Sequence, residues 1–350
     1  MTRHYPARQL QNLASDIFVA AGLERSRAEL IARGFLEADL MGFSTHGLSR
    51  VPANVKWLES GTTRAHGEPV VLYDAPAAAS WDACFLPGPY VMHLAIDHAA
   101  QRASQQGVYL MTLRRAQHIA CLASYLVPIV ERGLVGIIMA STPDEAFVSP
   151  FKGRTPLFSN NPIAFCAPTS ADPVLFDVST AVTAGGQVAR AAREGRQLPE
   201  ACLKDASGRV TADPTVLGKG GSVMPVGGEG HGHKGYALTV LTEILTQVLA
   251  GYGRDRGAGD GEANSVLLQI IDPRLIAGHA DYLHEMDYLL ESIRSSAPDD
   301  ADEPVRVPGE RSWSMRRQRL AEGVDLYPGV FEGLLAQARR LGVDTDLVAR

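Results

Sequence analysis

The chain has 350 residues, 45% of them hydrophobic and 21% charged, a balance typical of a folded globular protein long enough for two domains. Its formal net charge of −6 argues against nucleic acid as the main partner, because phosphate binding needs a basic surface. No apolar run approaches the ~18 residues that suggest a membrane span, so we expect no membrane association.

The first 60 residues are predicted to form helices. Apolar residues recur at helical spacing over three segments, 10–22, 26–42 and 47–60. Ser26 and Glu29 fit a capping box at the start of the second segment, in which Ser26 accepts from the amide of Glu29 and Glu29 reaches back.

Strands and helices alternate from about residue 68 onward. Buried strands are predicted over 107–113, 133–140, 174–178 and 265–271, and helices over 89–106, 122–131, 236–250 and 329–341. The helix over 236–250 is apolar nearly all round, so we expect it to be buried. Residues 251–264 and 296–303 are polar and are predicted to form an exposed loop and a surface linker. The alternation indicates an α/β layer structure.

The cysteines indicate the cellular compartment. Cys84, Cys121, Cys166 and Cys202 lie far apart and form no Cys-x-x-Cys pair. The N-terminus is polar and lacks the apolar stretch of a signal peptide. We therefore expect a cytoplasmic protein without disulfides.

The segment 218–235 is the richest in glycine. It contains a G-x-G-x-x-G pattern at Gly230, Gly232 and Gly235. A Rossmann fingerprint needs a strand directly before this pattern, and no strand is expected there, so we reject that interpretation. A loop that leads into a helix can still offer its amides, together with Lys234, to a phosphate. A mobile surface loop with a solvated lysine is the alternative.

Two histidines and an arginine are candidates for acid–base chemistry. His46 and Arg50 are four residues apart, so they share a face if the chain is helical there. An imidazole beside a guanidinium can bind a carboxylate and transfer a proton, although such pairs also occur on ordinary surfaces. His118 follows a buried strand, where side chains of α/β proteins often line active sites, and a histidine at a helix start is the alternative.

A metal site is not expected. His118 and Cys121 are one helical turn apart and His231 lies near His233, but no second pair has zinc-site spacing and carboxylates do not cluster near them. A Cys–His nucleophile at Cys121 stays open, with a small buried hydrophobe as the alternative.

Further segments are informative because they occur in one fixed order between about residues 10 and 342. They are Ala38–Arg50, His118 before a helix, Asn161–Phe165, Phe176–Thr180, Leu198–Pro199 with Asp205, Gly208 and Thr211–Pro214, Gly232–Tyr236, and Val307–Glu310. This ordered set resembles the malate/L-lactate dehydrogenase family that is distinct from the Rossmann lactate dehydrogenases.

The resemblance implies a fold and a reaction. The fold is a non-Rossmann α/β dinucleotide-binding fold with a mixed sheet, in which residues 1–70 and 290–350 form one helical domain and 71–289 the cofactor domain. The reaction is hydride transfer between NAD(P)H and a small 2-oxo or 2-hydroxy acid, with NAD or NADP as cofactor and a small carboxylic acid as substrate. A homodimer is also implied.

The resemblance also implies site residues. His118 or His46 is the acid or base, and we expect Arg50, with Asn161, to bind the substrate. The cofactor contacts fall on Thr142, Asp177, Val178, Ser179, His233, Lys234, Pro308, Gly309 and Glu310.

Three departures from the family pattern flank the expected pocket. Relatives usually carry Ser-Asn-His, Gly-Thr-Asn-Pro and Asp-Met-Ala-Thr, where this chain has Ala116–His118, Ser159–Pro162 and Asp177–Thr180. The substrate is therefore open, and two alternatives stand beside the main interpretation. One is an imine reductase acting on cyclic imino acids such as piperideine-2-carboxylate, and the other is a non-catalytic dinucleotide-binding protein.

Overall fold

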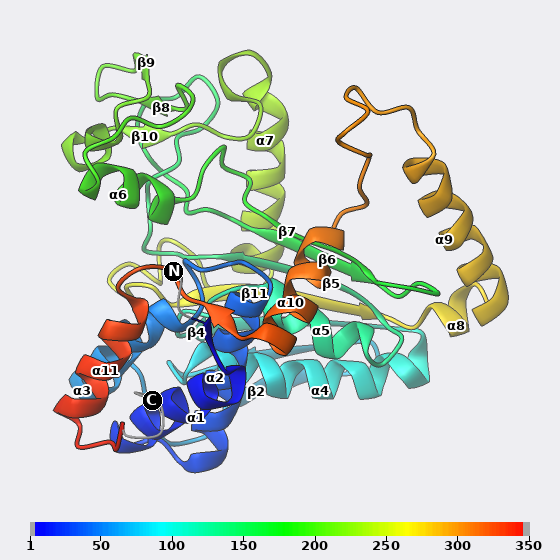
Figure 1. The fold of residues 1–350 in the computed structure, drawn as a ribbon, viewed down its shortest axis with the longest axis horizontal. Coiled ribbons are helices and arrows are strands. Elements are labelled where there is room, and N and C mark those ends of the chain that lie inside the picture. The colour runs from blue at the N-terminus through cyan, green and yellow to red at the C-terminus, as the bar shows by residue number, and fades with distance from the viewer. Residues whose placement is uncertain (1–3, 346–350) are drawn as a thin grey trace.

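A seven-stranded sheet forms the centre of the computed structural model, which describes residues 4–345 (Figure 1). The predicted terminal-domain ends, 1–3 and 346–350, lie outside the described residues. The strand order is β2-β3-β4-β11-β5-β6-β7, and β3 pairs in parallel with β4 while the other neighbours are antiparallel. The strands are β2 (Val70–Asp74), β3 (Ala78–Asp82), β4 (Val108–Ala116), β5 (Val135–Ser141), β6 (Ile163–Ala167), β7 (Val174–Val178) and β11 (Asn264–Ile271). The expected α/β fold with a mixed sheet is confirmed.

Several strand ends meet at one edge of this sheet. The last residues of β4 and β5, Ala116 and Ser141, pair with Asn264 and Ser265 at the start of β11. The start of β6 pairs with the end of β7, at Ile163 and Val178. The loops that leave or enter these strands therefore gather along a single edge.

Helices cover both faces of the sheet. Side chains alternate between faces along a strand, and in β5 Gly136 faces Ile129 of α5 (Ala123–Val130), whereas Ser141 bonds Thr246 of η3 (Ile244–Val248). Helix α4 (Gly88–Gln106) lies beside α5, and α7 (Gly228–Glu243) continues directly into the π-helical η3 (Figure 1).

Helices from both chain ends pack together, as the resemblance implied. They are α1 (Ala7–Ala20), α2 (Arg25–Leu40), α3 (Val51–Ser60), α10 (Glu310–Glu322) and α11 (Val330–Arg340). The short strands β1 (His4–Tyr5) and β12 (Val324–Asp325) also join the two ends. One hydrophobic core runs through these helices and the sheet, from Tyr5 to Ala338. The domain boundaries at residues 70 and 290 stay a prediction.

The predicted capping box at α2 is wrong. The helix begins at Arg25 after the N-cap residue Glu24, and no side chain caps it. The Ser26 hydroxyl donates to the Glu24 carboxylate at 2.8 Å, so Ser26 is bound to the residue two positions earlier instead of to the amide of Glu29.

A second lobe has a small core of its own. Its elements are α6 (Gly185–Arg193), β8 (Leu203–Lys204), β9 (Val210–Thr211), η2 (Pro214–Lys219) and β10 (Ser222–Val223). The three strands form a separate antiparallel sheet, and Val188, Leu203 and Val223 are buried at its centre.

Two predictions about α7 are wrong. The helix begins at Gly228, so the G-x-G-x-x-G glycines lie in its first turns and not in a loop. Glycine is needed at Gly235 because a Cβ there would lie 2.5 Å from the Val226 nitrogen. The helix is also not buried all round, since Leu238, Leu241 and Ile244 are 44%, 41% and 49% exposed.

A short helix and a long one extend from the body as an arm. Helix α8 (Pro273–Ile276) follows β11, and α9 (His279–Arg294) projects away from the sheet before the chain returns through the linker 296–303 (Figure 1). The linker is exposed, as predicted. Within residues 4–345, no helix has the length and apolar character to cross a membrane.

Candidate functional site

A cavity of about 360 Å³ lies at the sheet edge where the strand ends meet. Its walls come from seven parts of the chain: Thr45, His46 and Arg50; His118–Ala120 and Leu122; Ala140–Thr142, Glu145 and Phe147; Ser159, Asn160 and Pro162; Gly185 and Gly186; Leu217; and Glu262 and Asn264. A smaller cavity of about 170 Å³ shares His46 and Asn160 and adds Asp177 and Ser179.

A short turn carries His46 and Arg50 to this cavity. The predicted helix over 47–60 begins as the 3-10 turn η1 (Leu48–Arg50) and continues as α3. The buried Asp39 holds the turn, because its carboxylate accepts from the amide of Leu48 at 2.7 Å. A Cβ on Gly47 would overlap the Asp39 carboxyl group, so only glycine fits there.

His46 and His118 lie side by side although 72 residues separate them. Their rings are nearly parallel, with centroids 5.8 Å apart and an interplanar angle of 12°. The ring of Trp57 lies 6.2 Å from that of His118. The structure thus brings together the two candidate acid–base residues.

The Nδ1 atoms of the two histidines have different hydrogen-bond partners. The amide of Ala120 donates to Nδ1 of His118 at 3.2 Å, and Ala120 holds the uncommon φ of +61° that lets it do so. Nδ1 of His118 is therefore an acceptor, and the neutral ring carries its proton on Nε2. Nδ1 of His46 faces the Thr45 hydroxyl at 2.8 Å, and a hydroxyl can either donate or accept.

Both imidazoles favour the neutral form. Burial, and next the charge of Arg50, lower the pKa of His46 to about 4. Burial, Arg50 and His46 also lower the pKa of His118 well below its usual value. A substrate anion beside Arg50 would offset part of the repulsion and raise both pKa values.

Arg50 has room for a carboxylate. Its Nη2 forms an ion pair with Glu262, and its guanidinium lies 5.4 Å from the centre of the Trp57 ring. Its Nε is buried and has no hydrogen-bond partner among the described residues. A planar guanidinium with a free edge is suited to a bidentate carboxylate.

Asn161 does not face the cavity. It is fully buried, its Nδ2 donates to Glu243 at 2.9 Å, and its Oδ1 accepts from Ser159 at 2.6 Å. Its neighbour Asn160 lines the cavity instead. Asn161 therefore lies behind the cavity wall, and the substrate contact predicted for it stays a prediction.

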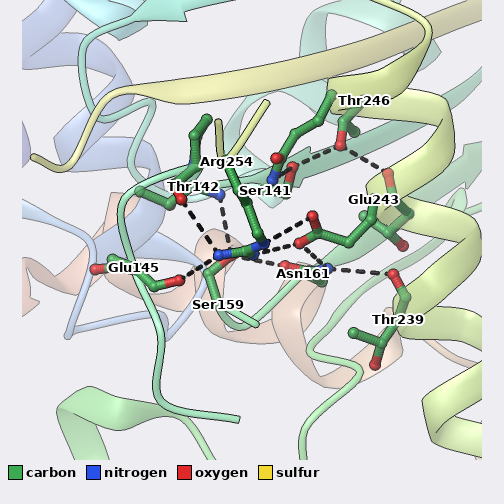
Figure 2. A network of polar contacts seen from close by, with 12 residues as sticks. Ser141, Thr142, Glu145, Ser159, Asn161, Thr239, Glu243, Thr246 and Arg254 are labelled. Carbon is green, nitrogen blue, oxygen red and sulfur yellow. Dashed lines mark hydrogen bonds and ion pairs between the residues drawn. The ribbon is translucent and has the colours of Figure 1, made fainter. Parts of the chain in front are cut away.

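A polar network behind the wall is centred on Arg254 (Figure 2). Its guanidinium pairs with Glu243 at 2.5 Å and donates to the carbonyl oxygens of Pro143 and Glu145 at 3.2 and 2.7 Å. Arg254 belongs to the loop 251–264, which was predicted to be exposed. That prediction is wrong for this residue, because the network draws the loop against α7 and the end of β5.

Three of the predicted cofactor residues line the cavities. Thr142 lines the larger one and accepts from Asn264 at 2.9 Å. Asp177 and Ser179 line the smaller one, and Val178 between them is 51% exposed. Asp177 accepts from the amide of Ala123 at 2.9 Å, and burial raises its pKa to about 6.

The other predicted cofactor residues lie outside the two cavities, and among them Pro308 and Gly309 contact β7. Pro308 accepts from the amide of Leu175 in β7 at 3.1 Å, next to Gly309 and Glu310. Gly309 has a φ of +102°, and a Cβ there would lie 2.8 Å from the Leu175 nitrogen. His233 and Lys234 are exposed on α7, which bonds the end of β7 through Thr239 and Thr180 at 3.0 Å.

The site has features that fit a dinucleotide. Gly185 and Gly186 begin α6 at the cavity wall, and backbone amides at a helix N-terminus attract phosphate. A Cβ at Gly185 would lie 3.6 Å from the Phe147 ring, and a Cβ at Gly186 would lie 3.8 Å from Thr45. Larger side chains at these two positions would therefore take up the space next to Phe147 and Thr45. Within residues 4–345, no three His, Cys, Asp or Glu side chains form a group that could hold a metal ion.

The sequence analysis missed the acidic residues of the site. Glu145 lies four residues after the end of β5, and Glu262 lies two residues before β11. A polar residue close to the end of a buried strand is the signal that could have found both, as it did for His118. Glu243 carried no signal, because it belongs to a helix that was expected to be buried throughout.

Comparisons with known proteins extend along the whole chain. A family model for malate/L-lactate dehydrogenase matches residues 5–335. The L-sulfolactate dehydrogenase of Methanothermobacter thermautotrophicus is 31% identical over 342 residues, which cover 96% of each protein. The malate dehydrogenase structure from Pyrococcus horikoshii has a TM-score of 0.88 at 25% identity, covering 98% of this chain and 96% of that one. The Δ1-piperideine-2-carboxylate reductase structure from Pseudomonas syringae has a TM-score of 0.85 at 30% identity, covering 96% of this chain and 100% of that one.

Proposed function

Because the chain belongs to the malate/L-lactate dehydrogenase family, we propose that it is an NAD(P)-dependent oxidoreductase that interconverts a small 2-oxo acid and its 2-hydroxy acid. The observation that carries this proposal is the convergence of Arg50, His46 and His118 on one cavity. A carboxylate clamp and two proton-bearing rings are what reduction of a 2-oxo acid requires of the protein.

The cofactor would bind along the wall formed by Asp177, Ser179 and Thr142, with a phosphate at the amides of Gly185 and Gly186. A bound nicotinamide supplies the hydride-transfer chemistry. We retain Pro308–Glu310 as a further contact because this segment packs on the strand that carries Asp177. We also retain His233 and Lys234, which are exposed on α7.

Arg50 would bind the substrate carboxylate with its guanidinium and so orient the carbonyl carbon. His118 Nε2 would donate a hydrogen bond to the carbonyl oxygen, on which negative charge develops during reduction. We assign the transferred proton to His46, because Thr45 can accept from a second ring proton, whereas the amide of Ala120 already points at Nδ1 of His118.

The test is oxidation of NADH and of NADPH with a panel of 2-oxo acids, together with fluorescence titration of each nicotinamide. We expect saturable binding of at least one cofactor and turnover with at least one acid. A protein that binds a nicotinamide but turns over no acid would be the non-catalytic alternative, and a protein that binds neither cofactor would contradict the proposal outright.

We also propose a homodimer. Apolar side chains remain exposed on η3 and the arm: Val248 is 69% exposed, Ile276 68% and Tyr288 70%. Exposed apolar surface of this extent is typical of an interface between subunits. Sedimentation should give twice the mass of one chain, and Val248→Asp should weaken the association. A wild-type protein that sediments as a single chain at micromolar concentration would exclude it.

We infer a cytoplasmic location from the cysteines. Cys84, Cys121, Cys166 and Cys202 are all unpaired. Burial raises the pKa of Cys166 to about 12 and also raises the pKa of Cys121, so these thiols are poor nucleophiles. They suit a reducing compartment, and Cys121 fits a buried hydrophobe better than a nucleophile.

A further inference from the structure

The cavity holds more negative than positive charge. Among its lining residues, Arg50 is the single arginine or lysine, whereas Glu145 and Glu262 contribute two carboxylates. The lowered pKa values of His46 and His118 leave both rings uncharged when no ligand is present. Arg50 can therefore balance only one of the two acidic groups before any substrate enters.

The carboxylate of Glu262 lies close to both Arg50 and His118. It forms the ion pair with Arg50, and its carboxylate lies 3.9 Å from Nε2 of His118. Any group of the substrate that sits between Arg50 and His118 must therefore lie close to this carboxylate.

Glu145 is held in place on the adjoining wall. The Arg254 guanidinium binds its carbonyl oxygen at 2.7 Å (Figure 2). Burial and the charge of Glu262 raise the pKa of Glu145, whereas Arg50 lowers it. These opposing effects indicate that the two carboxylates and Arg50 interact through the same small space.

A second anionic group on the substrate would find no cation there. The Arg254 guanidinium is already bound to Glu243 and to two backbone carbonyl groups. The amides of Gly185 and Gly186 are the remaining anion-attracting groups of the wall, and they are assigned above to the cofactor. Like charges brought together in a half-buried site are strongly unfavourable.

We propose that Glu145 and Glu262 form a charge filter that admits acids with a single negative charge and rejects dianions. This inference rests on the proposed function and names its substrate class. The substrate is a 2-oxo acid with an uncharged remainder, or a cyclic 2-imino acid whose protonated C=N nitrogen carries a positive charge beside Glu262. Dicarboxylates and sulfonated acids are excluded.

The experiment compares kcat/KM for oxaloacetate, a dianion, with kcat/KM for pyruvate, a monoanion, in the wild type and in Glu262→Gln and Glu145→Gln. We expect the wild-type ratio of oxaloacetate to pyruvate to be below about 0.1, and each substitution to raise it about tenfold. Freeing Arg50 from Glu262 would raise kcat/KM for both acids alike, so the ratio of the two kcat/KM values isolates the charge effect. Piperideine-2-carboxylate should lose activity in Glu262→Gln, because its cationic nitrogen loses a partner.

Asp255→Asn is the matched control, since it removes one negative charge from an exposed position on the same loop and should leave the ratio unchanged. A wild-type preference for oxaloacetate, or a ratio that neither glutamate variant raises, would overturn the charge filter. Calorimetric binding of oxamate, a monoanion, and tartronate, a dianion, separates this outcome from failure of the proposed function. Selective binding of oxamate without turnover would keep the filter and reject the enzyme, whereas equal binding of both would reject the filter.

Discussion

At the residue scale, burial beside a fixed cation decides the chemistry of His46 and His118. Each ring lies against the other and near Arg50, so the protein disfavours a proton on either of them until an anion enters. The substrate carboxylate would thus favour protonation of a histidine, because it offsets the charge of Arg50 as it binds. The protonated histidine can then act as the acid in the reaction.

The lowered pKa of His46 predicts a pH effect on stability. Its pKa is about 4 in the folded protein and 6.5 in the reference state, so the unfolded chain binds more protons between these values. The contribution is complete above pH 6.5 and is lost as the pH falls toward 4. His46→Gln should therefore reduce the loss of unfolding free energy between pH 7.5 and 5 by about 1–2 kcal/mol, measured by urea denaturation.

The exposed His284 provides the control, and His284→Gln should leave the pH dependence as in the wild type. An identical slope for His46→Gln and the wild type would mean that His46 titrates normally, and the assignment of a buried neutral ring would fail.

At the element scale, the Arg254 network holds the loop 251–264 against α7 and the end of β5 (Figure 2). Arg254→Ala would leave the carboxylate of Glu243, which is 12% exposed, with only Asn161 as a hydrogen-bond donor. We expect the variant to lose about 2–3 kcal/mol of unfolding free energy, because an unpaired buried charge costs more than a lost surface pair.

Arg256→Ala is the comparison on the same loop, because this exposed side chain donates only to the carbonyl oxygen of Gly251 at 3.1 Å. Its unfolding free energy should stay within about 0.5 kcal/mol of the wild type in chemical denaturation. If Arg254→Ala lost no more unfolding free energy than Arg256→Ala, the Arg254 network would not be what holds the loop in place.

At the scale of the whole molecule, the strongly patterned parts could be predicted from the sequence. The strands predicted over 107–113, 133–140, 174–178 and 265–271 all form. Three of them are apolar runs that are largely buried, whereas β7, at the edge of the sheet, is only partly buried. The strand β2 was not predicted although its residues Val70–Tyr73 favour a strand, and all five of its residues are exposed. The start of α7 was missed because glycine is a poor helix former, and only its close packing on Val226 explains it.

The candidate site could be predicted only in part, for a related reason. His46, Arg50 and His118 belong to segments that match a known family pattern, and the structure brings all three to one cavity. Glu145, Glu262 and Arg254 act through contacts between residues about 110 or more positions apart, and no local pattern encodes such contacts.

The central claim is that His46, His118 and Arg50 form the reaction centre of a 2-oxo acid reductase, and single-turnover oxidation of bound NADH or NADPH tests it most directly. The wild type should oxidise the nicotinamide when a monoanionic 2-oxo acid is added, and His46→Ala and His118→Ala should slow this step about 100-fold or more while still binding the cofactor. Rates equal to the wild type in both variants would contradict the account.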